Sequence, residues 1–231
     1  MAKLVVLTGI SSPIGSSIAE ELLRAGYEIC GQYHQHPPEL DAEGQPVTLL
    51  QADLRTSEGC RALAEHALSL GTPAALINNA ALFERSPLQR YERNQSEQML
   101  ALNTLAPLEL AHHLHGALAT YSPGNIVNLV DNCSHHRPWP QHSSYAASKA
   151  ALVAITRSLA SELAPHVRVN AIGPGLISES EPKEWTKLKH KIPAARWGQP
   201  AEIAEAVRLL LQGPTYLTGQ VLTIDGGWST R

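Results

Sequence analysis

The chain has 231 residues, of which 43% are hydrophobic and 17% charged, a balance typical of a globular protein. Its formal charge of -3 gives no electrostatic reason to expect nucleic acid or a membrane as a partner. No apolar run approaches the roughly 20 residues of a membrane span, and Met1–Leu7 runs straight into a strand pattern, so we expect no signal peptide. Cys30, Cys60 and Cys133 are far apart and odd in number, which favours reduced, mostly buried thiols in a cytoplasmic protein.

Short apolar runs alternate with helical stretches along the whole chain. The apolar runs predict strands at Lys3–Thr8, Glu28–Tyr33, Val47–Leu50, Ala74–Asn78, Asn125–Val130, Val167–Ala171 and Val221–Ile224. Helical spacing predicts helices at Ile14–Ala25, Thr56–Leu70, Ser96–Leu118, Ser143–Leu163 and Pro200–Leu211. No repeat or linker divides the chain, so we expect a single domain over residues 1–231 with an α/β fold, in which helices cover both faces of a parallel sheet.

The first strand and the first helix are joined by a loop that reads Thr8-Gly9-Ile10-Ser11-Ser12-Pro13-Ile14-Gly15-Ser16. Glycine lets the backbone approach a pyrophosphate, whose charge the N–H groups and dipole of the new helix stabilise. The middle glycine of the usual pattern is replaced by Pro13, which suits the first helical position. A purely structural turn is the alternative, and the strand–loop–helix context favours a dinucleotide site. The candidate cofactor contacts in this loop are Thr8, Gly9, Ser11, Ser12, Pro13, Ile14 and Gly15.

The second strand ends in Tyr33-His34-Gln35-His36, with no carboxylate before Glu39. Nicotinamide sites without a ribose phosphate usually carry Asp or Glu at this point. A phosphate would be tolerated here, and His34, Gln35, Ser11 and Ser12 could hydrogen-bond it, although no Arg or Lys is present to pair with it. We therefore expect NADP rather than NAD, with Tyr33, His34 and Gln35 near the 2′ group. The alternative is that these histidines are loop residues without a partner.

Ligands of parallel α/β sheets bind outside the carboxyl ends of the strands. Candidate site residues should therefore follow Thr8, Tyr33, Asn78, Val130 and Ala171.

The segment Ser178–Pro193 is polar, carries Trp185 and is longer than a typical connection. It indicates a substrate lid, which we place at residues 178–194.

The helix predicted at Ser143–Leu163 carries Tyr145 and Lys149 four residues apart, so the two side chains share a face. An ammonium beside a phenol favours release of the phenol's proton, which suits proton transfer. Tyr-x-x-x-Lys often marks only a solvated face. Here it follows a strand end and has small neighbours, which leave room for a ligand.

Taken together, the motifs resemble those of the short-chain dehydrogenase/reductase family over the whole chain and in order. They are the loop Thr8–Gly15, Asn78-Asn79-Ala80, Asn103, Tyr145-x-x-x-Lys149, Pro174-Gly175 and Asp225-Gly226-Gly227. The resemblance implies a Rossmann-like, doubly wound seven-stranded sheet, usually in a homotetramer, with a dimer as the alternative. It implies an NADPH-dependent reductase of a small-molecule substrate, in which hydride leaves the nicotinamide and Tyr145 supplies the proton.

The same resemblance implies further roles. Lys149 would bind the nicotinamide ribose, and Asn103 would hold a water that passes protons to it. The remaining implied cofactor contacts are Asp53 and Leu54 at adenine, Asn79 and Ala80 at the adenosine ribose, and Pro174, Gly175 and Ile177 at the nicotinamide.

One departure from the family pattern concerns the substrate. The family usually has a serine at the end of the fifth strand, where this chain has Asp131 by strand alignment. An aspartate there resembles the pteridine reductases, including dihydromonapterin reductases, as do Phe83, where an aromatic can stack on a pterin, and Trp185 in the lid. The gap from Asp131 to Tyr145 is one residue longer than usual, so Asn132 is the alternative occupant, with Ser134 also nearby.

This resemblance implies hydride transfer to the C=N bond of a dihydropterin, with Asp131 accepting N–H bonds or relaying a proton. The alternatives are an NADP-dependent carbonyl or alcohol oxidoreductase of the same family, and a non-catalytic NADP-sensing protein. Phe83 is alternatively a core residue, and Trp139 and Trp185 line the pocket or simply pack the lid. We expect no metal site, because no carboxylate or cysteine completes the histidines His112, His113, His115, His135, His136 and His142 at a suitable spacing.

Overall fold

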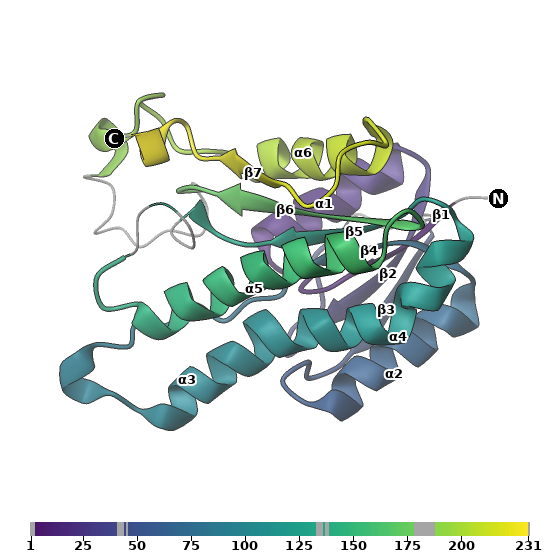
Figure 1. The fold of residues 1–231 in the computed structure, drawn as a ribbon, viewed down its shortest axis with the longest axis horizontal. Coiled ribbons are helices and arrows are strands. Elements are labelled where there is room, and N and C mark those ends of the chain that lie inside the picture. The colour runs from purple at the N-terminus through teal and green to yellow at the C-terminus, as the bar shows by residue number, and fades with distance from the viewer. Residues whose placement is uncertain are drawn as a thin grey trace.

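Seven parallel strands form one central sheet in the order β3-β2-β1-β4-β5-β6-β7 (Figure 1). The computed structural model describes residues 3–40, 44, 46–132, 136, 139–177 and 188–230. The strands are β1 Lys3–Leu7, β2 Tyr27–Tyr33, β3 Val47–Gln51, β4 Pro73–Asn78, β5 Gly124–Leu129, β6 Val167–Pro174 and β7 Val221–Ile224. Every predicted strand is present, and the predicted doubly wound, Rossmann-like α/β fold is confirmed.

Helices cover both faces of this sheet (Figure 1). α1 (Pro13–Arg24) packs beside α6 (Pro200–Gln212) on one face. α2 (Ser57–Leu70), α4 (Ala106–Thr120) and α5 (Ser143–Glu162) cover the other. α1, α2, α5 and α6 agree with the predicted helices to within one residue at each end.

The helix predicted over Ser96–Leu118 is not one regular helix. α3 (Arg93–Leu100) is followed by a π-helical turn at Ala101–Leu105, and only then does α4 begin. The break has a local cause at Pro107, which lacks an N–H and whose ring would clash with the carbonyl four residues earlier in a regular helix. The widened turn avoids that clash, and such turns frequently occur at functional sites.

Capping residues fix where α1 and α2 start. The side chain of Ser12 accepts a hydrogen bond from the backbone N–H of Gly15 at 3.0 Å, and Pro13 begins α1 without losing a helical bond. Thr56 caps α2 in the same way through Gly59. The sequence predicts Pro13 as the first helical position of α1 and Thr56 as the cap of α2, because these residues avoid or satisfy otherwise unpaired N–H groups, whereas the Ser12 cap is found only in the structure.

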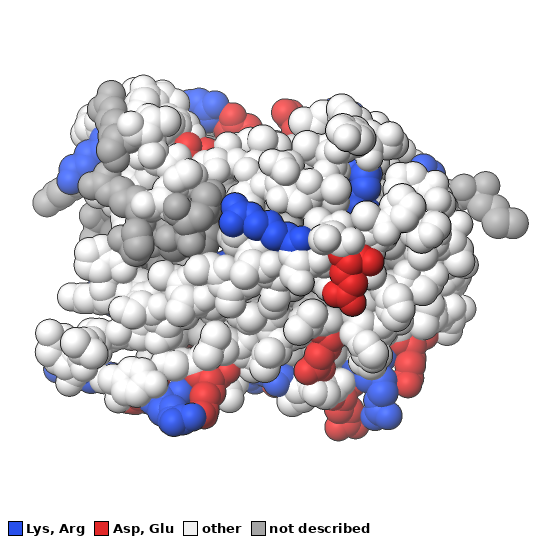
Figure 2. Space-filling view, in the orientation of Figure 1, with Lys and Arg blue, Asp and Glu red and all other residues white. Residues whose placement is uncertain are grey.

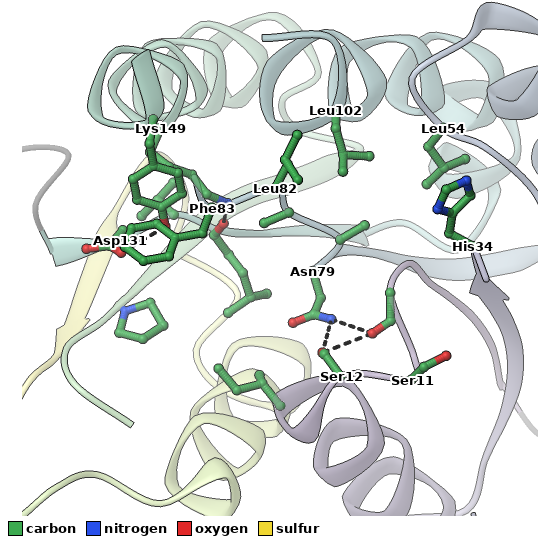
Figure 3. Close-up of a pocket in the computed structure, with 18 of the residues that line it drawn as sticks. Ser11, Ser12, His34, Leu54, Asn79, Leu82, Phe83, Leu102, Asp131 and Lys149 are labelled. Atoms are coloured by element: carbon green, nitrogen blue, oxygen red, sulfur yellow. Dashed lines mark hydrogen bonds between the residues drawn. The ribbon is translucent and has the colours of Figure 1, made fainter. Parts of the chain in front are cut away.

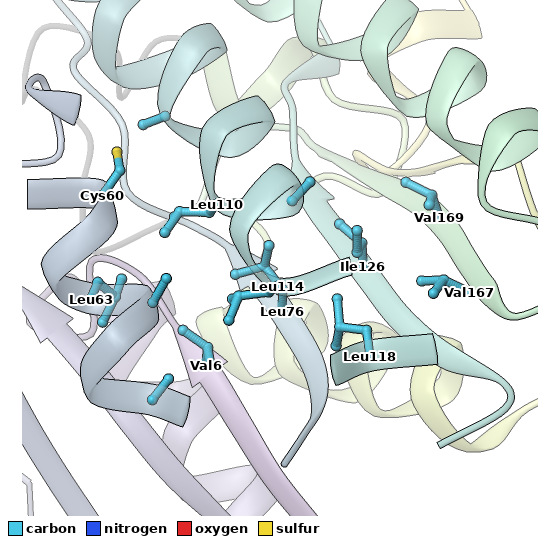
Figure 4. Packing of buried hydrophobic residues seen from close by; sticks show 14 of the residues in the cluster. Val6, Cys60, Leu63, Leu76, Leu110, Leu114, Leu118, Ile126, Val167 and Val169 are labelled. Carbon is cyan, nitrogen blue, oxygen red and sulfur yellow. The ribbon is translucent and has the colours of Figure 1, made fainter. Parts of the chain in front are cut away.

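Two apolar layers, one on each face of the sheet, form the core. Along β1, Leu4 and Val6 pack against one layer, while Val5 and Leu7 pack against the other. This alternation explains why the strands are apolar throughout, since both faces are buried. Figure 4 shows the layer under α2 and α4, in which Leu110, Leu114 and Leu118 reach Leu76 and Ile126. The side chains in this layer are almost wholly buried.

The surface over α4 and α5 is poor in charge. Figure 2 shows a mostly white surface there, interrupted by a blue and a red side chain, with further charged side chains near α2 and α3 and near α6. Leu108 of α4 is exposed there, as are Leu100 and Leu105 in the helical turns just before α4. Within the described part of the chain, no helix combines the length and the apolar character that crossing a membrane requires.

Candidate active site

A cavity of about 780 Å³ lies at the carboxyl ends of the strands, where the sheet rule predicts a ligand. Its size falls within the roughly 300–1,000 Å³ typical of small-molecule sites. Figure 3 shows Ser11, Ser12, His34 and Leu54 at one end, and Phe83, Asp131 and Lys149 at the other. We call these the adenosine end and the catalytic end.

The cavity collects most of the residues predicted from the sequence. Those that line it are Gly9, Ser11, Ser12, Ile14, Tyr33, His34, Gln35, Asp53, Leu54, Asn79, Ala80, Phe83, Asp131, Tyr145, Lys149, Pro174, Gly175 and Ile177. Four others, Thr8, Pro13, Gly15 and Asn103, are not among the lining residues. Trp185, Ser134 and most of the predicted lid at residues 178–194 lie outside the described residues.

The glycine loop is held in place by the end of β4. The side-chain N–H group of Asn79 donates to the carbonyl oxygens of Thr8 and Gly9, at 3.1 and 2.9 Å, and to the hydroxyl of Ser12. Gly9 has a φ of +65°, and a Cβ there would lie 2.8 Å from the Cα of Ala80. Glycine is therefore required by both conformation and space.

Thr8 supports this loop from inside the protein. Its hydroxyl accepts the backbone N–H groups of Asn79 and Ala80, each at 3.0 Å, and the residue is almost fully buried. Thr8 thus joins the ends of β1 and β4, and it fixes the two backbones that face the cavity. Thr8 lies behind the residues that line the cavity, whereas the sequence had suggested that it contacts the cofactor directly.

A carboxylate and a cation share the adenosine end. Asp53 accepts hydrogen bonds from Nε of Arg55 at 2.8 Å and from Nη2 at 2.6 Å, and its carboxylate lies 3.7 Å from Nε2 of His34. The Arg55 guanidinium lowers the pKa of Asp53 to about 2, so that this carboxylate is ionised at neutral pH.

Arg55 also lines the cavity, so the expectation that no Arg or Lys stands at this end is wrong. The end of β2 itself carries no Arg or Lys. The parallel pairing of Tyr33 with Gln51 brings the loop after β3, which carries Arg55, next to the end of β2. Knowing that β2 and β3 are neighbours in the sheet would have identified Arg55.

At the catalytic end, the hydroxyl of Tyr145 donates a hydrogen bond to Oδ2 of Asp131 at 2.8 Å. Nζ of Lys149 donates to the carbonyl oxygen of Leu129 at 2.6 Å. Both α5 side chains line the cavity although Tyr145 is only 5% exposed and Lys149 only 1%. The alternative interpretation, in which Tyr145 and Lys149 mark only a solvated helix face, is therefore wrong.

The two candidates at the end of β5 point to different partners. Asp131 faces Tyr145, whereas the amide of Asn132 donates to Oδ2 of Asp225, 3.4 Å away. Asp225 is itself held by the backbone N–H groups of Gly227 and Ser229. The position opposite the phenol is thus taken by Asp131, as strand alignment had suggested.

Asn103 lies in the π-helical turn and is fully buried. Its side chain bonds both the N–H and the carbonyl of Leu82, at 2.8 and 2.9 Å, and its amide also donates to the hydroxyl of Ser148 at 3.0 Å. Ser148 in turn donates to the backbone carbonyl of Tyr145. Asn103 therefore connects α5 to the segment that carries Phe83, and Ser148 is a supporting residue that the sequence did not suggest.

Phe83 lines the cavity and is not part of the hydrophobic core. It is 42% exposed, its ring stacks on His142 with centroids 4.7 Å apart, and its edge meets Tyr145 at the same separation. Trp139 lines the cavity and stacks on Trp228, which comes from the C-terminal turn. The sequence did not suggest that His142 stacks on Phe83 or Trp228 on Trp139, because both contacts join distant parts of the chain.

Among the described residues, no group of three His, Cys, Asp or Glu side chains is placed to hold a metal ion. Cys30 and Cys60 are buried free thiols, and burial raises the pKa of Cys30 to about 11. Cys133 lies outside the described residues.

Comparison with protein families supplies the wider context for this geometry. The family model described as enoyl-(acyl carrier protein) reductase matches residues 9–229, nearly the whole chain. The chain belongs to the short-chain dehydrogenase/reductase family. This short-chain dehydrogenase/reductase is thus an oxidoreductase, and the cavity with its Tyr145–Lys149 pair is its candidate active site.

Curated relatives of this short-chain dehydrogenase/reductase are similar over almost their full length. It is 29% identical to 2-dehydro-3-deoxy-D-gluconate 5-dehydrogenase of Escherichia coli, over 99% of this chain and 96% of the relative. It is 30% identical to an uncharacterised oxidoreductase of Bacillus subtilis, over 99% of each. It is 28% identical to 3-oxoacyl-(acyl-carrier-protein) reductase of Staphylococcus aureus, over 98% of each.

A solved structure shares the fold closely. A blue fluorescent protein from a metagenomic library, in complex with NADPH, superposes with a TM-score of 0.90 at 28% identity, over 98% of each chain. The relatives with assigned activities are named for a dehydrogenase and a keto reductase. They therefore give no support to the pteridine-specific part of the sequence resemblance, and they fit the carbonyl or alcohol alternative better.

Proposed function

We propose that this short-chain dehydrogenase/reductase is an NADPH-dependent reductase in which Tyr145 supplies the proton. The observation that carries the proposal is the hydrogen bond from the Tyr145 hydroxyl to Asp131, on the helix turn that also presents Lys149. Tyr145, Lys149 and Asp131 are proposed as residues that act on the substrate, and Asn103 as a residue that holds α5 in position.

The cavity fits a dinucleotide. Gly9 lines the cavity in the loop before α1, and α1 presents its N-terminus to the same region, which suits a pyrophosphate. His34, Asp53 and Arg55 line the cavity beyond the ends of β2 and β3, and Gly175 lines it beyond the end of β6, on the other side of the sheet. The NADPH-bound structure with the same fold supports this choice of cofactor. When bound, the cofactor supplies the hydride.

The protein's own contribution is a positioned proton. The Tyr145 hydroxyl carries one hydrogen, which Asp131 accepts at 2.8 Å. Lys149 contributes a buried ammonium on the same face of α5, which favours the ionised form that Tyr145 reaches after giving up its proton. The nearly complete burial of both side chains limits water at the point of transfer.

For the substrate, the geometry favours the C=N bond of a dihydropterin. A pterin presents N–H groups, and a carboxylate is an acceptor that matches them. If a substrate N–H occupies Asp131, the Tyr145 hydroxyl is released to protonate a ring nitrogen. The half-exposed ring of Phe83 in the cavity wall offers a flat surface for such a heterocycle.

Reduction of a carbonyl, or oxidation of the corresponding alcohol, is the second candidate. The names of the curated relatives favour it, since they describe a sugar-acid dehydrogenase and an oxoacyl reductase. In this case a carbonyl oxygen would take the hydrogen bond of Tyr145, and Asp131 would compete for the same hydrogen. The third reading, a non-catalytic NADP sensor, gives no reason for Tyr145 to meet Asp131 in the cavity.

The test is a spectrophotometric screen of NADPH oxidation with dihydromonapterin, dihydrobiopterin, dihydrofolate and simple ketones. We expect turnover of a dihydropterin. Activity on ketones alone would establish the second candidate, and tight NADPH binding without any turnover would favour the sensor.

The accompanying variant is Tyr145→Phe, which removes the proton donor and keeps the ring. We expect nearly intact cofactor binding and a loss of turnover of at least about 100-fold, as is typical for a positioned acid. Tyr216→Phe is the matched control, because Tyr216 is fully exposed and should retain full activity. Retained turnover in Tyr145→Phe would contradict the assigned donor.

The single domain over residues 1–231, the substrate lid and the homotetramer remain proposals from the family resemblance. The low density of charged side chains over α4 and α5 supports subunit contact there (Figure 2). The mass of the protein in solution tests that contact.

A further inference from the structure

Arg55 is a feature of the cavity that the proposed reaction leaves without a role. Among the described residues that line the cavity, Arg55 and Lys149 are the only Lys or Arg side chains. Lys149 lies at the catalytic end (Figure 3), whereas Arg55 is paired with Asp53, whose carboxylate lies 3.7 Å from His34 of the adenosine end. The side chain of Arg55 is 35% exposed and therefore open to a ligand.

Strand pairing brings Arg55 next to the end of β2. Tyr33 of β2 is in register with Gln51 of β3, and the side chain of Gln51 donates to the carbonyl of His34 at 2.9 Å. The hydroxyl of Ser11 in the glycine loop donates to the carbonyl of His36. Three loops therefore meet around one rim, and Arg55 stands on the third of them.

The charges at this rim decide whether the site tolerates a ribose that carries a 2′-phosphate. The carboxylate of Asp53 is ionised, and Gln35, at the end of β2, is neutral. A 2′-phosphate brings roughly −1.5 to −2 charges. Asp53 alone would repel it, whereas Arg55 brings the pair to neutrality and adds donors.

The guanidinium of Arg55 is only partly used. Nε and Nη2 bond Asp53, while Nη1 makes no hydrogen bond to any residue in the described part of the chain. Asp53 holds the planar group in one orientation, which reduces the entropy lost when a ligand binds. Asp53 thus positions the guanidinium of Arg55. The Nη1 side of that group, which we call its free edge, is available to donate hydrogen bonds to an anion.

We propose that Arg55 is the specificity-determining residue for NADPH over NADH, binding the 2′-phosphate through its free edge while Asp53 holds it. The inference rests on the proposed function, because it assumes that this cavity takes a nicotinamide dinucleotide. The inference places the discrimination between NADPH and NADH in the loop after β3, whereas the sequence alone had placed it at His34 and Gln35.

The test is calorimetric titration of the full chain with NADPH and NADH, and with two fragments, adenosine 2′,5′-bisphosphate and adenosine 5′-monophosphate. In Arg55→Gln we expect Kd for NADPH and for the bisphosphate to rise about tenfold or more, because a charge-assisted bond is lost. Kd for NADH and for the monophosphate should change less than about twofold. Arg61→Gln is the matched control, since it removes the same charge from an exposed position on α2.

The outcomes separate the inference from the proposed function. An unaltered preference for NADPH in Arg55→Gln overturns the role of Arg55 and leaves the function standing. Equal weakening of the bisphosphate and the monophosphate also overturns it, since that indicates a general loss at the adenosine end. If the unaltered chain binds neither dinucleotide, the inference and the proposed function both fail.

Discussion

Replacing Asp131 with serine removes the acceptor that holds the hydroxyl hydrogen of Tyr145 at 2.8 Å. A hydrogen bond to a charged group contributes about 1.5–3 kcal/mol, and about 1.4 kcal/mol corresponds to a tenfold change in rate. If a pterin N–H group binds Asp131 in the transition state, kcat/KM for the dihydropterin should fall between about tenfold and 150-fold. If a ketone must instead take the Tyr145 hydrogen away from Asp131, Asp131→Ser should leave ketone reduction unchanged or raise it.

The measurement is steady-state NADPH oxidation with one dihydropterin and one ketone, at fixed pH and with the same enzyme preparation. Asn132→Ser is the control, because Asn132 is adjacent in sequence but bonds Asp225. Thermal unfolding of each variant establishes that it is folded. Equal losses on both substrates, or pterin kinetics that do not change, would refute the reasoning that Asp131 recognises an N–H donor.

Two further predictions concern the glycine loop and a surface ion pair. Gly15→Ala should destabilise the chain by about 1–3 kcal/mol and weaken cofactor binding, since the added Cβ would collide with the carbonyl oxygen of Gly9. Gly116→Ala is the control, because no atom lies within 4 Å of an added Cβ there, and it should stabilise the chain by about 0.5–1 kcal/mol. Thermal unfolding measures both changes. Arg196 lowers the pKa of Glu202 to about 2, below the usual 4.5, so this pair's stabilisation is present above pH 4.5 and is lost as the pH falls through about 2. Because the pair is partly exposed, Glu202→Gln should cost only about 0.2–1 kcal/mol near neutral pH. Melting curves at several pH values check this, with Glu205→Gln as the control, and a loss that does not shrink at low pH would contradict it.

The order and kind of the elements could be predicted because each pattern reflects local physics. Strands buried on both faces must be apolar throughout, and the caps Ser12 and Thr56 satisfy N–H groups at the helix starts. The π-helical turn at Ala101–Leu105 was missed, since it depends on how Pro107 fits against a helix already packed on the sheet. Helical periodicity alone does not carry that information.

The site was predictable where a motif and a strand end coincide, as at Asn79 and Tyr145. It was not predictable where two strands must first be placed side by side. Arg55 lies more than twenty positions from His34, and only the pairing of β2 with β3 brings their loops to one rim. His142 reaches Phe83 for a similar reason, through the loop before α5.

The extra residue between Asp131 and Tyr145 shows why spacing and strand register can disagree. Counting back from Tyr145 at the usual interval gives Asn132, but the register of β5 with β6 fixes Leu129 opposite Ile172, and Asp131 follows at the sheet edge. A slip of β5 by one residue would exchange the side chains that pack in the two apolar layers, Ile126 in one and Val127 in the other, whereas a loop absorbs an insertion at little cost. The register therefore decides which side chain meets the phenol, and Asn132 is left to bond Asp225. Under the proposed function, substrate choice depends on Asp131, a carboxylate that the sheet places opposite the phenol, whereas the Tyr145–Lys149 pair on α5 takes part whatever the substrate.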